Sequence, residues 1–197
     1  MEKMGDIEVK DHRYGQLAQH MLRQGPETSI KVKDGEWEEM ALHRAVRSGH
    51  EVEAQLLLDK GADVDGKDLF GETALHVATR NGHAAMLQLL LDKGADMEAK
   101  NICGQTALHL AVALSENEKI TRLLIKKGAD IHVNDIYSLT ALSVAVSYGN
   151  ESAVQLLVEN GANPEEEDAY GETPLSWAAK YGHVAVTELL ESQIKQS

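Results

Sequence analysis

Apolar residues occur in pairs of short clusters along most of the chain, and each cluster has a helical spacing. Between Gly71 and Gly94 the first cluster reads ALHVAT and the second reads MLQLLL. Apolar side chains three and four positions apart form one stripe of an α-helix. Gly82 and Gly94 follow the two clusters and favour the left-handed backbone that ends a helix, while Thr73 can cap the first helix. The pattern predicts two short helices joined by a turn.

A loop follows this pair of helices, and the whole pattern then begins again. Similar segments, 33, 33, 34 and 33 residues apart, begin at Glu38, Gly71, Gly104, Ser138 and Gly171. Internal periods of about 20 to 50 residues are typical of solenoids and related arrays. We therefore divide the chain into an N-terminal segment, residues 1–37, and five repeats: 38–70, 71–103, 104–137, 138–170 and 171–197.

One pair of short helices cannot bury its own apolar surface, so the repeats must stack on one another. A small residue in the first predicted helix of each repeat would allow close approach: Ala45, Ala78, Ala111, Ala145 and Ala178. The expected fold class is all-α, with stacked helix-turn-helix units joined by hairpin-like loops.

Four of the repeats share a motif at the start of their first helix. It reads TALHVA from Thr73, TALHLA from Thr106, TALSVA from Thr140 and TPLSWA from Thr173. A Gly-Ala-Asp or Gly-Ala-Asn turn also recurs, at Gly61, Gly94, Gly128 and Gly161. These residues resemble the ankyrin repeats, whose period is about 33 residues and whose signature is T-P-L-H-x-A. The resemblance implies an ankyrin-repeat solenoid, although the first repeat has Met40 in place of the threonine.

Both ends of the array carry features expected of caps. AQHMLRQG from Ala18 resembles AQLLLDKG from Ala54, which suggests a degenerate half-repeat within residues 1–37 whose helix would cap the array. In the last repeat, Glu191 replaces the apolar residue found earlier as Leu58, Leu91, Ile125 and Val158. Terminal repeats need a polar outer side. We therefore expect a complete array.

The third repeat departs from the others at the turn between its helices. It contains one extra residue near Ser115, and SENE replaces the Gly-His pair seen at Gly82 and His83. We expect a tolerated loop insertion with a local change of curvature.

Composition narrows the classes of function. The formal net charge is −13 without a concentrated basic stripe, and such a field repels phosphate, so we expect no nucleic-acid binding. No apolar run reaches about 18 residues, and the N-terminus lacks the apolar stretch of a signal peptide, so we expect no membrane span. Cys103 is the only cysteine, which favours a reducing compartment. We expect an intracellular protein, cytoplasmic or nuclear.

The nine histidines invite a metal or acid-base interpretation, but most of their positions follow the repeat. Three share a position where the family resemblance implies a hydrogen-bonding role at the first helix: His43, His76 and His109. Three more share the turn position: His50, His83 and His183. Equivalent residues of successive repeats lie about 10 Å apart, whereas zinc ligands converge to about 2.0 Å from one ion. We expect structural histidines, and neither a metal nor a cofactor.

Motifs for phosphate binding or nucleophilic catalysis do not occur in the sequence, so we expect no enzyme. The resemblance instead implies two sets of partner contacts, at the loop tip before each repeat and at the exposed end of each first helix. These ten positions hold six of the chain's eight aromatic residues, against about 0.4 expected by chance, and aromatics are enriched at interface hot spots. We predict partner contacts at Trp37, Phe70, Tyr137, Tyr170, Leu114, Tyr148 and Tyr181.

The tip aromatics have two interpretations. They could contact a partner, or they could pack against the neighbouring hairpins as a ladder. Three apolar residues lie beside them in the sequence: Leu69, Ile102 and Ile136. Trp177, inside the first helix of the last repeat, is expected to pack.

The resemblance implies a non-catalytic protein-protein interaction module: an adaptor, scaffold or inhibitor that binds a partner protein through a concave groove and the loop tips. An architectural subunit of a larger complex is the alternative. An enzyme or small-molecule-binding protein would need a pocket with convergent polar groups. We expect a monomer when unbound.

Overall fold

The computed structural model of the protein describes residues 36–195, with side chains from Ala41 onward. All described elements belong to one compact unit, residues 34–197. Between residues 36 and 195 the chain forms ten α-helices, one short 3-10 helix and no strand. The predicted all-α class is confirmed for these residues.

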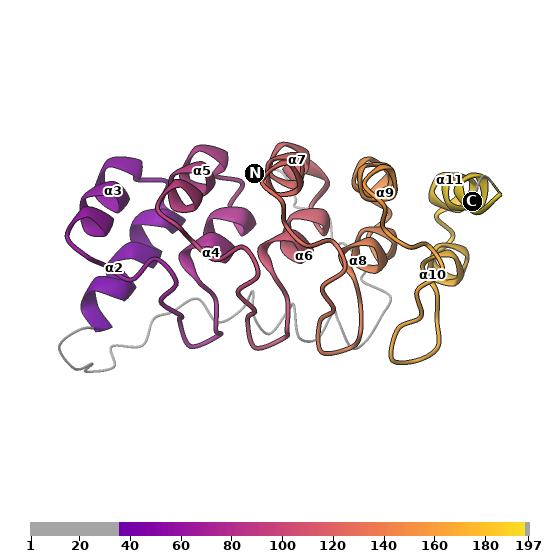
Figure 1. Cartoon of the computed structure of the whole chain (residues 1–197), viewed down its shortest axis with the longest axis horizontal. Coiled ribbons are helices and arrows are strands. Elements are labelled where there is room, and N and C mark those ends of the chain that lie inside the picture. The colour runs from indigo at the N-terminus through magenta and orange to yellow at the C-terminus, as the bar shows by residue number, and fades with distance from the viewer. Residues whose placement is uncertain (1–35, 196–197) are drawn as a thin grey trace, which may run out of the picture. The chain divides into compact units, whose positions relative to one another are not determined.

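The helices alternate along the chain between two layers (Figure 1). The first helices of the pairs are α2 (Glu36–Arg47), α4 (Ala74–Arg80), α6 (Ala107–Val112), α8 (Ala141–Ser147) and α10 (Pro174–Tyr181). The second helices are α3 (Glu51–Asp59), α5 (Ala84–Asp92), α7 (Glu118–Lys126), α9 (Glu151–Glu159) and α11 (Val184–Ile194). Consecutive pairs pack first helix on first helix and second on second. The connecting loops project from the side of the first helices (Figure 1). This stacking is the predicted solenoid.

Threonine and glycine define the limits of the helices as predicted. Thr73 is the extended N-cap residue of α4, and its backbone N–H donates to Nδ1 of His76 at 3.1 Å. Gly82 after α4 has a φ of 71°, and Gly94 after α5 has a φ of 88°. Glycine adopts this left-handed backbone without the clash of a Cβ atom. The chain can therefore turn sharply enough for the second helix to fold back on the first.

The core lies within each helix pair and between consecutive pairs. The small residues of the first helices are at most 1% exposed: Ala45, Ala78, Ala111, Ala145 and Ala178. Leu87 and Leu90 of α5 are fully buried. Truncating such a leucine to alanine costs about 2 to 5 kcal/mol. Every repeat thus contributes to one continuous core.

The third repeat absorbs its extra residue in a turn. The 3-10 helix η1 (Ser115–Asn117) occupies the inserted stretch between α6 and α7. Asn117 is the N-cap residue of α7, and its Nδ2 donates to the carbonyl of Thr79 in the preceding repeat at 2.9 Å. The predicted loop insertion is confirmed, and it stays connected to the neighbouring first helix.

The first repeat begins differently from the others. Helix α2 starts at Glu36, five residues before Ala41, where the repeat pattern would start it. Trp37 therefore lies inside a helix, and its predicted place at a loop tip is wrong. Met40 cannot cap a helix as threonine does, and the glutamates before it favour the N-terminal turn of a helix. Apart from Glu36 and Trp37, the proposed half-repeat within residues 1–37 lies outside the described residues.

Candidate partner-binding surface

The hairpin tips are built on one repeated aspartate or asparagine. Its Oδ1 accepts two backbone N–H groups, from the residues two and four positions later, at 2.8 to 3.0 Å. The residues are Asp68, Asn101, Asp135 and Asp168. Sequence reasoning missed this position, although an Asp or Asn two residues before each tip residue could have indicated it. The bonds hold every tip in the same conformation.

Neighbouring tips are also joined to each other by backbone hydrogen bonds. Ile102 donates to the carbonyl of Phe70 at 3.0 Å, and Ile136 donates to that of Cys103 at 3.1 Å. Ala169 donates to the carbonyl of Tyr137 at 3.1 Å. The tips therefore form a continuous ledge along the repeats.

Apolar side chains along this ledge face solvent. Leu69 is 83% exposed, Ile102 59% and Ile136 57%, and Tyr170 at the last tip is 55% exposed. We call these four residues the tip row. Phe70 and Tyr137, which were predicted as contacts, are less exposed than the tip row, because each is half-buried. Cys103 is buried. Burial also raises the pKa of the Cys103 thiol, which disfavours its reactive thiolate form.

The ends of the first helices form a second row on the same layer. We call it the helix-end row; it consists of Arg47, Ser48, Arg80, Asn81, Ala113, Leu114, Ser147, Tyr148, Lys180 and Tyr181. Of the three residues predicted there as contacts, Tyr148 is 48% exposed, while Leu114 and Tyr181 are half-buried.

Tyr148 is the most exposed of the three predicted contacts in the helix-end row. Burial raises the pKa of its phenol, and the positive charge of Arg80 acts in the opposite direction. Arg80 belongs to the repeat two before that of Tyr148, so the row brings these two side chains within electrostatic range.

The ring of Tyr181 is engaged by its own helix. It stacks on Trp177 with 5.3 Å between ring centroids and 12° between planes. The indole Nε1 of Trp177 donates to Oδ2 of Asp168 at 2.9 Å, and the Lys180 ammonium lies 4.4 Å from the indole centroid. Trp177 therefore packs, as predicted, and Tyr181 covers it.

The first set of histidines links consecutive repeats. Nε2 of each lies 2.8 to 3.1 Å from a backbone carbonyl of the next repeat, that of Glu72, Gln105 or Leu139. In His76 and His109, Nδ1 accepts the backbone N–H of the N-cap threonine, so Nε2 carries the proton and donates it. Burial lowers the pKa of both imidazoles, which is consistent with the neutral form. The hydrogen-bonding role implied by the resemblance is confirmed.

The histidines at the turn between the two helices also link consecutive repeats, here to the preceding one. Nε2 of His83 lies 3.2 Å from the carbonyl of Arg47, and that of His183 lies 3.3 Å from the carbonyl of Ser147. In the third and fourth repeats an asparagine makes the bond: Asn117 to Thr79 and Asn150 to Val112, both at 2.9 Å. Sequence reasoning missed the asparagines. Among the described residues, no three His, Cys, Asp or Glu side chains are grouped as a metal site would require.

A family model described as ankyrin repeats, in three copies, matches residues 8–101, 70–135 and 108–197. The chain belongs to the ankyrin repeat family. Ankyrin repeats generally bind other proteins, so this array belongs to a class of interaction modules. Comparison with curated proteins gave no match. Between residues 36 and 195, no helix of the ankyrin array is long and apolar enough to cross a membrane.

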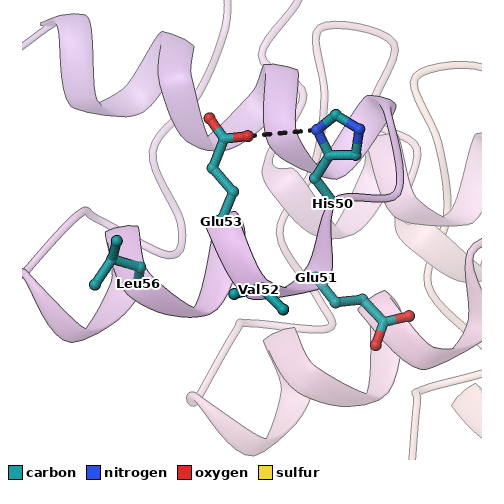
Figure 2. Close-up of a pocket in the computed structure, with 5 residues that line it drawn as sticks. All are labelled: His50, Glu51, Val52, Glu53 and Leu56. Atoms are coloured by element: carbon teal, nitrogen blue, oxygen red, sulfur yellow. Dashed lines mark hydrogen bonds and ion pairs between the residues drawn. The ribbon is translucent and has the colours of Figure 1, made fainter.

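A shallow hollow of about 480 Å³ lies at the start of α3 in the ankyrin array (Figure 2). His50, Glu51, Val52, Glu53 and Leu56 line it. Nδ1 of His50 lies 3.4 Å from Oε2 of Glu53, and both side chains are largely exposed. Small-molecule sites usually enclose their ligand and converge polar groups on it. Because this lining comes from one helix and its N-cap, we assign no site to the hollow.

Proposed function

We propose that this ankyrin array is a non-catalytic interaction module that binds a partner protein through the tip row and the helix-end row. The observation that supports it is the tip row itself, in which large apolar side chains stay exposed on hairpins that are hydrogen-bonded to one another. Contiguous exposed apolar surface on a soluble domain marks interaction sites. The proposed contacts are the tip row with Phe70, Tyr137, Leu114, Tyr148 and Tyr181.

The rigidity of the two rows supports this function. Each tip is held by the side-chain oxygen of an Asp or Asn, and neighbouring tips are joined by backbone hydrogen bonds. The helix-end row lies at the ends of helices that share one core. A surface that is ordered before binding loses less conformational entropy on association. An adaptor, scaffold or inhibitor needs such a preformed surface, and its partner decides which of the three it is.

The test begins with isolation of the partner from the native cell by affinity capture and mass spectrometry. Binding of the purified partner is then measured by calorimetry for Ile102→Ala, Ile136→Ala and Tyr148→Ala. Each variant should lose about 2 kcal/mol or more, at least about thirtyfold in Kd, as truncated hot-spot residues do. Folding stability should change by about 1 kcal/mol or less, because the side chains are exposed.

Val52→Ala is the matched control, because Val52 is an exposed apolar residue on the second-helix layer, at 86% exposure. It should bind as the unmodified protein does. Normal binding by all three row variants would contradict the proposed function.

A further inference from the structure

Acidic residues are distributed unequally between the two helix layers. The chain has 32 Asp and Glu residues and a net charge of −13. Among the first helices, α2 contains Glu36, Glu38 and Glu39, but α4, α6, α8 and α10 contain no Asp or Glu. Each of the second helices α3, α5, α7, α9 and α11 contains at least one. From the second repeat onward, the first-helix layer therefore departs from the acidic character of the chain.

The charges of the helix-end row are all positive. They are Arg47, Arg80 and Lys180, while the equivalent positions of the third and fourth repeats hold Ala113 and Ser147. Since the repeats stack in sequence order, the row has cationic side chains toward each end and none in the middle. This arrangement is complementary to a ligand that carries negative charges on both sides of a neutral centre.

Two of the cations lie beside acidic residues that precede the first helices. Arg80 pairs with Glu72, whose side chain is only 8% exposed, and Lys180 Nζ lies 3.8 Å from Glu172 Oε1. The guanidinium has five N–H donors, and one carboxylate accepts two in a bidentate pair. With 38% of its side chain exposed, Arg80 is oriented by Glu72 and still has donors to offer a second carboxylate.

The middle of the row is apolar and accessible. Leu114 is half-buried and Tyr148 is 48% exposed, in the two repeats that lack a cation. The charge of Arg80 reaches the phenol of Tyr148, so the cation and the apolar centre act on the same stretch of surface. An aromatic or aliphatic anchor placed there would contact Tyr148 while its acidic neighbours approach the cations.

We propose that the helix-end row binds an acidic segment of a partner protein that carries an apolar side chain between its carboxylates. The apolar side chain packs against Leu114 and Tyr148. The carboxylates pair with Arg80 on one side and Lys180 on the other. This inference rests on the proposed function and adds the chemistry of the partner. A nucleic acid would not match the apolar centre, and the net charge of −13 opposes its approach.

The test uses random 12-residue peptides displayed on phage and selected on the full chain, with the recovered peptides then synthesised and titrated by fluorescence anisotropy. The recovered sequences should carry Asp or Glu around a Leu, Phe, Tyr or Trp. Their affinity should fall as salt is raised, because ion pairs are screened. Tyr148→Ala should weaken binding at least about thirtyfold.

Glu72→Gln provides a sharper readout. Removing the hairpin carboxylate frees Arg80, so the same peptides should bind about two- to fivefold tighter, a gain that a folding defect would not produce. Glu72→Gln combined with Arg80→Gln should bind about three- to tenfold more weakly than Glu72→Gln alone. This comparison removes the guanidinium charge without leaving a buried unpaired carboxylate.

Neutral or basic peptides, or peptides unaffected by the Glu72 and Arg80 substitutions, would overturn the inference. If such peptides still depend on Tyr148, the proposed function stands without it. Recovery of no peptide, or only of peptides indifferent to Tyr148→Ala, counts against both. Equal competition by a single-stranded oligonucleotide would assign the row to polyanions and also overturn it.

Discussion

At the scale of single residues, every hairpin tip turns on one position with a left-handed backbone. Gly71, Gly104 and Gly171 have φ angles of 67°, 73° and 75°, and Ser138 has a φ of 58°. A Cβ atom clashes with the backbone in this conformation, which costs an L-residue about 1 to 2 kcal/mol. The backbone of the fourth repeat is therefore strained at Ser138, whereas glycine avoids this strain in the other repeats.

We predict that Ser138→Gly stabilises the protein. Relief of the left-handed strain outweighs the greater flexibility of glycine in the unfolded chain, for a net gain of about 0.5 to 1 kcal/mol. Urea unfolding followed by circular dichroism measures the change. Gly104→Ala is the opposite control: its Cβ would lie 2.8 Å from the Ile136 nitrogen, so it should destabilise. Unchanged or reduced stability of Ser138→Gly would contradict the prediction.

At the scale of helices, buried histidines couple each first helix to the next repeat. His76 and His109 accept at Nδ1 and donate from Nε2, and only the neutral imidazole can do both. Ser143 and Ser176 occupy this position in the last two repeats. Their hydroxyls bond within their own repeat, so the fourth and fifth repeats are joined without this link.

We predict that the array loses stability as the pH falls through the histidine range. Burial lowers the folded-state pKa of His76 and His109, while the unfolded imidazoles titrate near about 6.5. Between the folded and unfolded pKa values the unfolded chain binds more protons, so the stabilisation is complete above about pH 6.5 and declines below it. The urea midpoint should fall between about pH 7.5 and 5.5.

His109→Ser, which places the residue of the fourth repeat in the third, is the matched variant for this experiment. It should be less stable at pH 7.5, because the link to Leu139 is lost, and its stability should depend less on pH. A constant urea midpoint for the unmodified protein across this window would show that the histidines do not couple folding to protonation.

At the scale of the whole array, the repeat of residues 171–197 differs from the inner ones in its second helix, where Glu191 replaces an apolar residue. Helices α10 and α11 pack on α8 and α9, and Ala178 remains fully buried between them. Glu191 of α11 is exposed, and the half-buried ring of Trp177 in α10 stacks on that of Tyr181. The cap that the sequence predicts for this repeat stays a prediction.

Deletion of residues 171–197 should therefore expose the apolar side of α8 and α9. We expect aggregation or a broader, earlier unfolding transition, measured by light scattering and thermal unfolding. Glu191→Leu is the finer variant: it restores the apolar residue of the inner repeats on an exposed position, so it should fold but self-associate. A truncated protein that melted as sharply and at the same temperature would contradict the role of this repeat as a cap.

The sequence by itself determined the repeat, the alternation of helices and the residues that limit them. Apolar spacing, the N-cap threonine and the left-handed glycine act within a few residues, so Thr73, Gly82 and Gly94 could be placed correctly without a structure. It also contained the acid-free first helices of the second to fifth repeats, whose place in one layer was known only from the structure. The start of α2 could not be placed, because Met40 removed the local cap on which the prediction depended.

Only the tertiary structure decided which residues of each row face solvent. Ile102 is 59% exposed beside a buried Cys103, and Tyr181 is covered through its stacking on Trp177 while Tyr148 is not stacked in this way. Such differences arise because a side chain's exposure depends on residues of the adjacent repeats, about 33 positions away, and on the pairing of hairpin with helix, as in Arg80 with Glu72. The local sequence pattern therefore specifies the helix pair of each repeat, whereas packing against neighbouring repeats of different sequence decides which side chains are exposed.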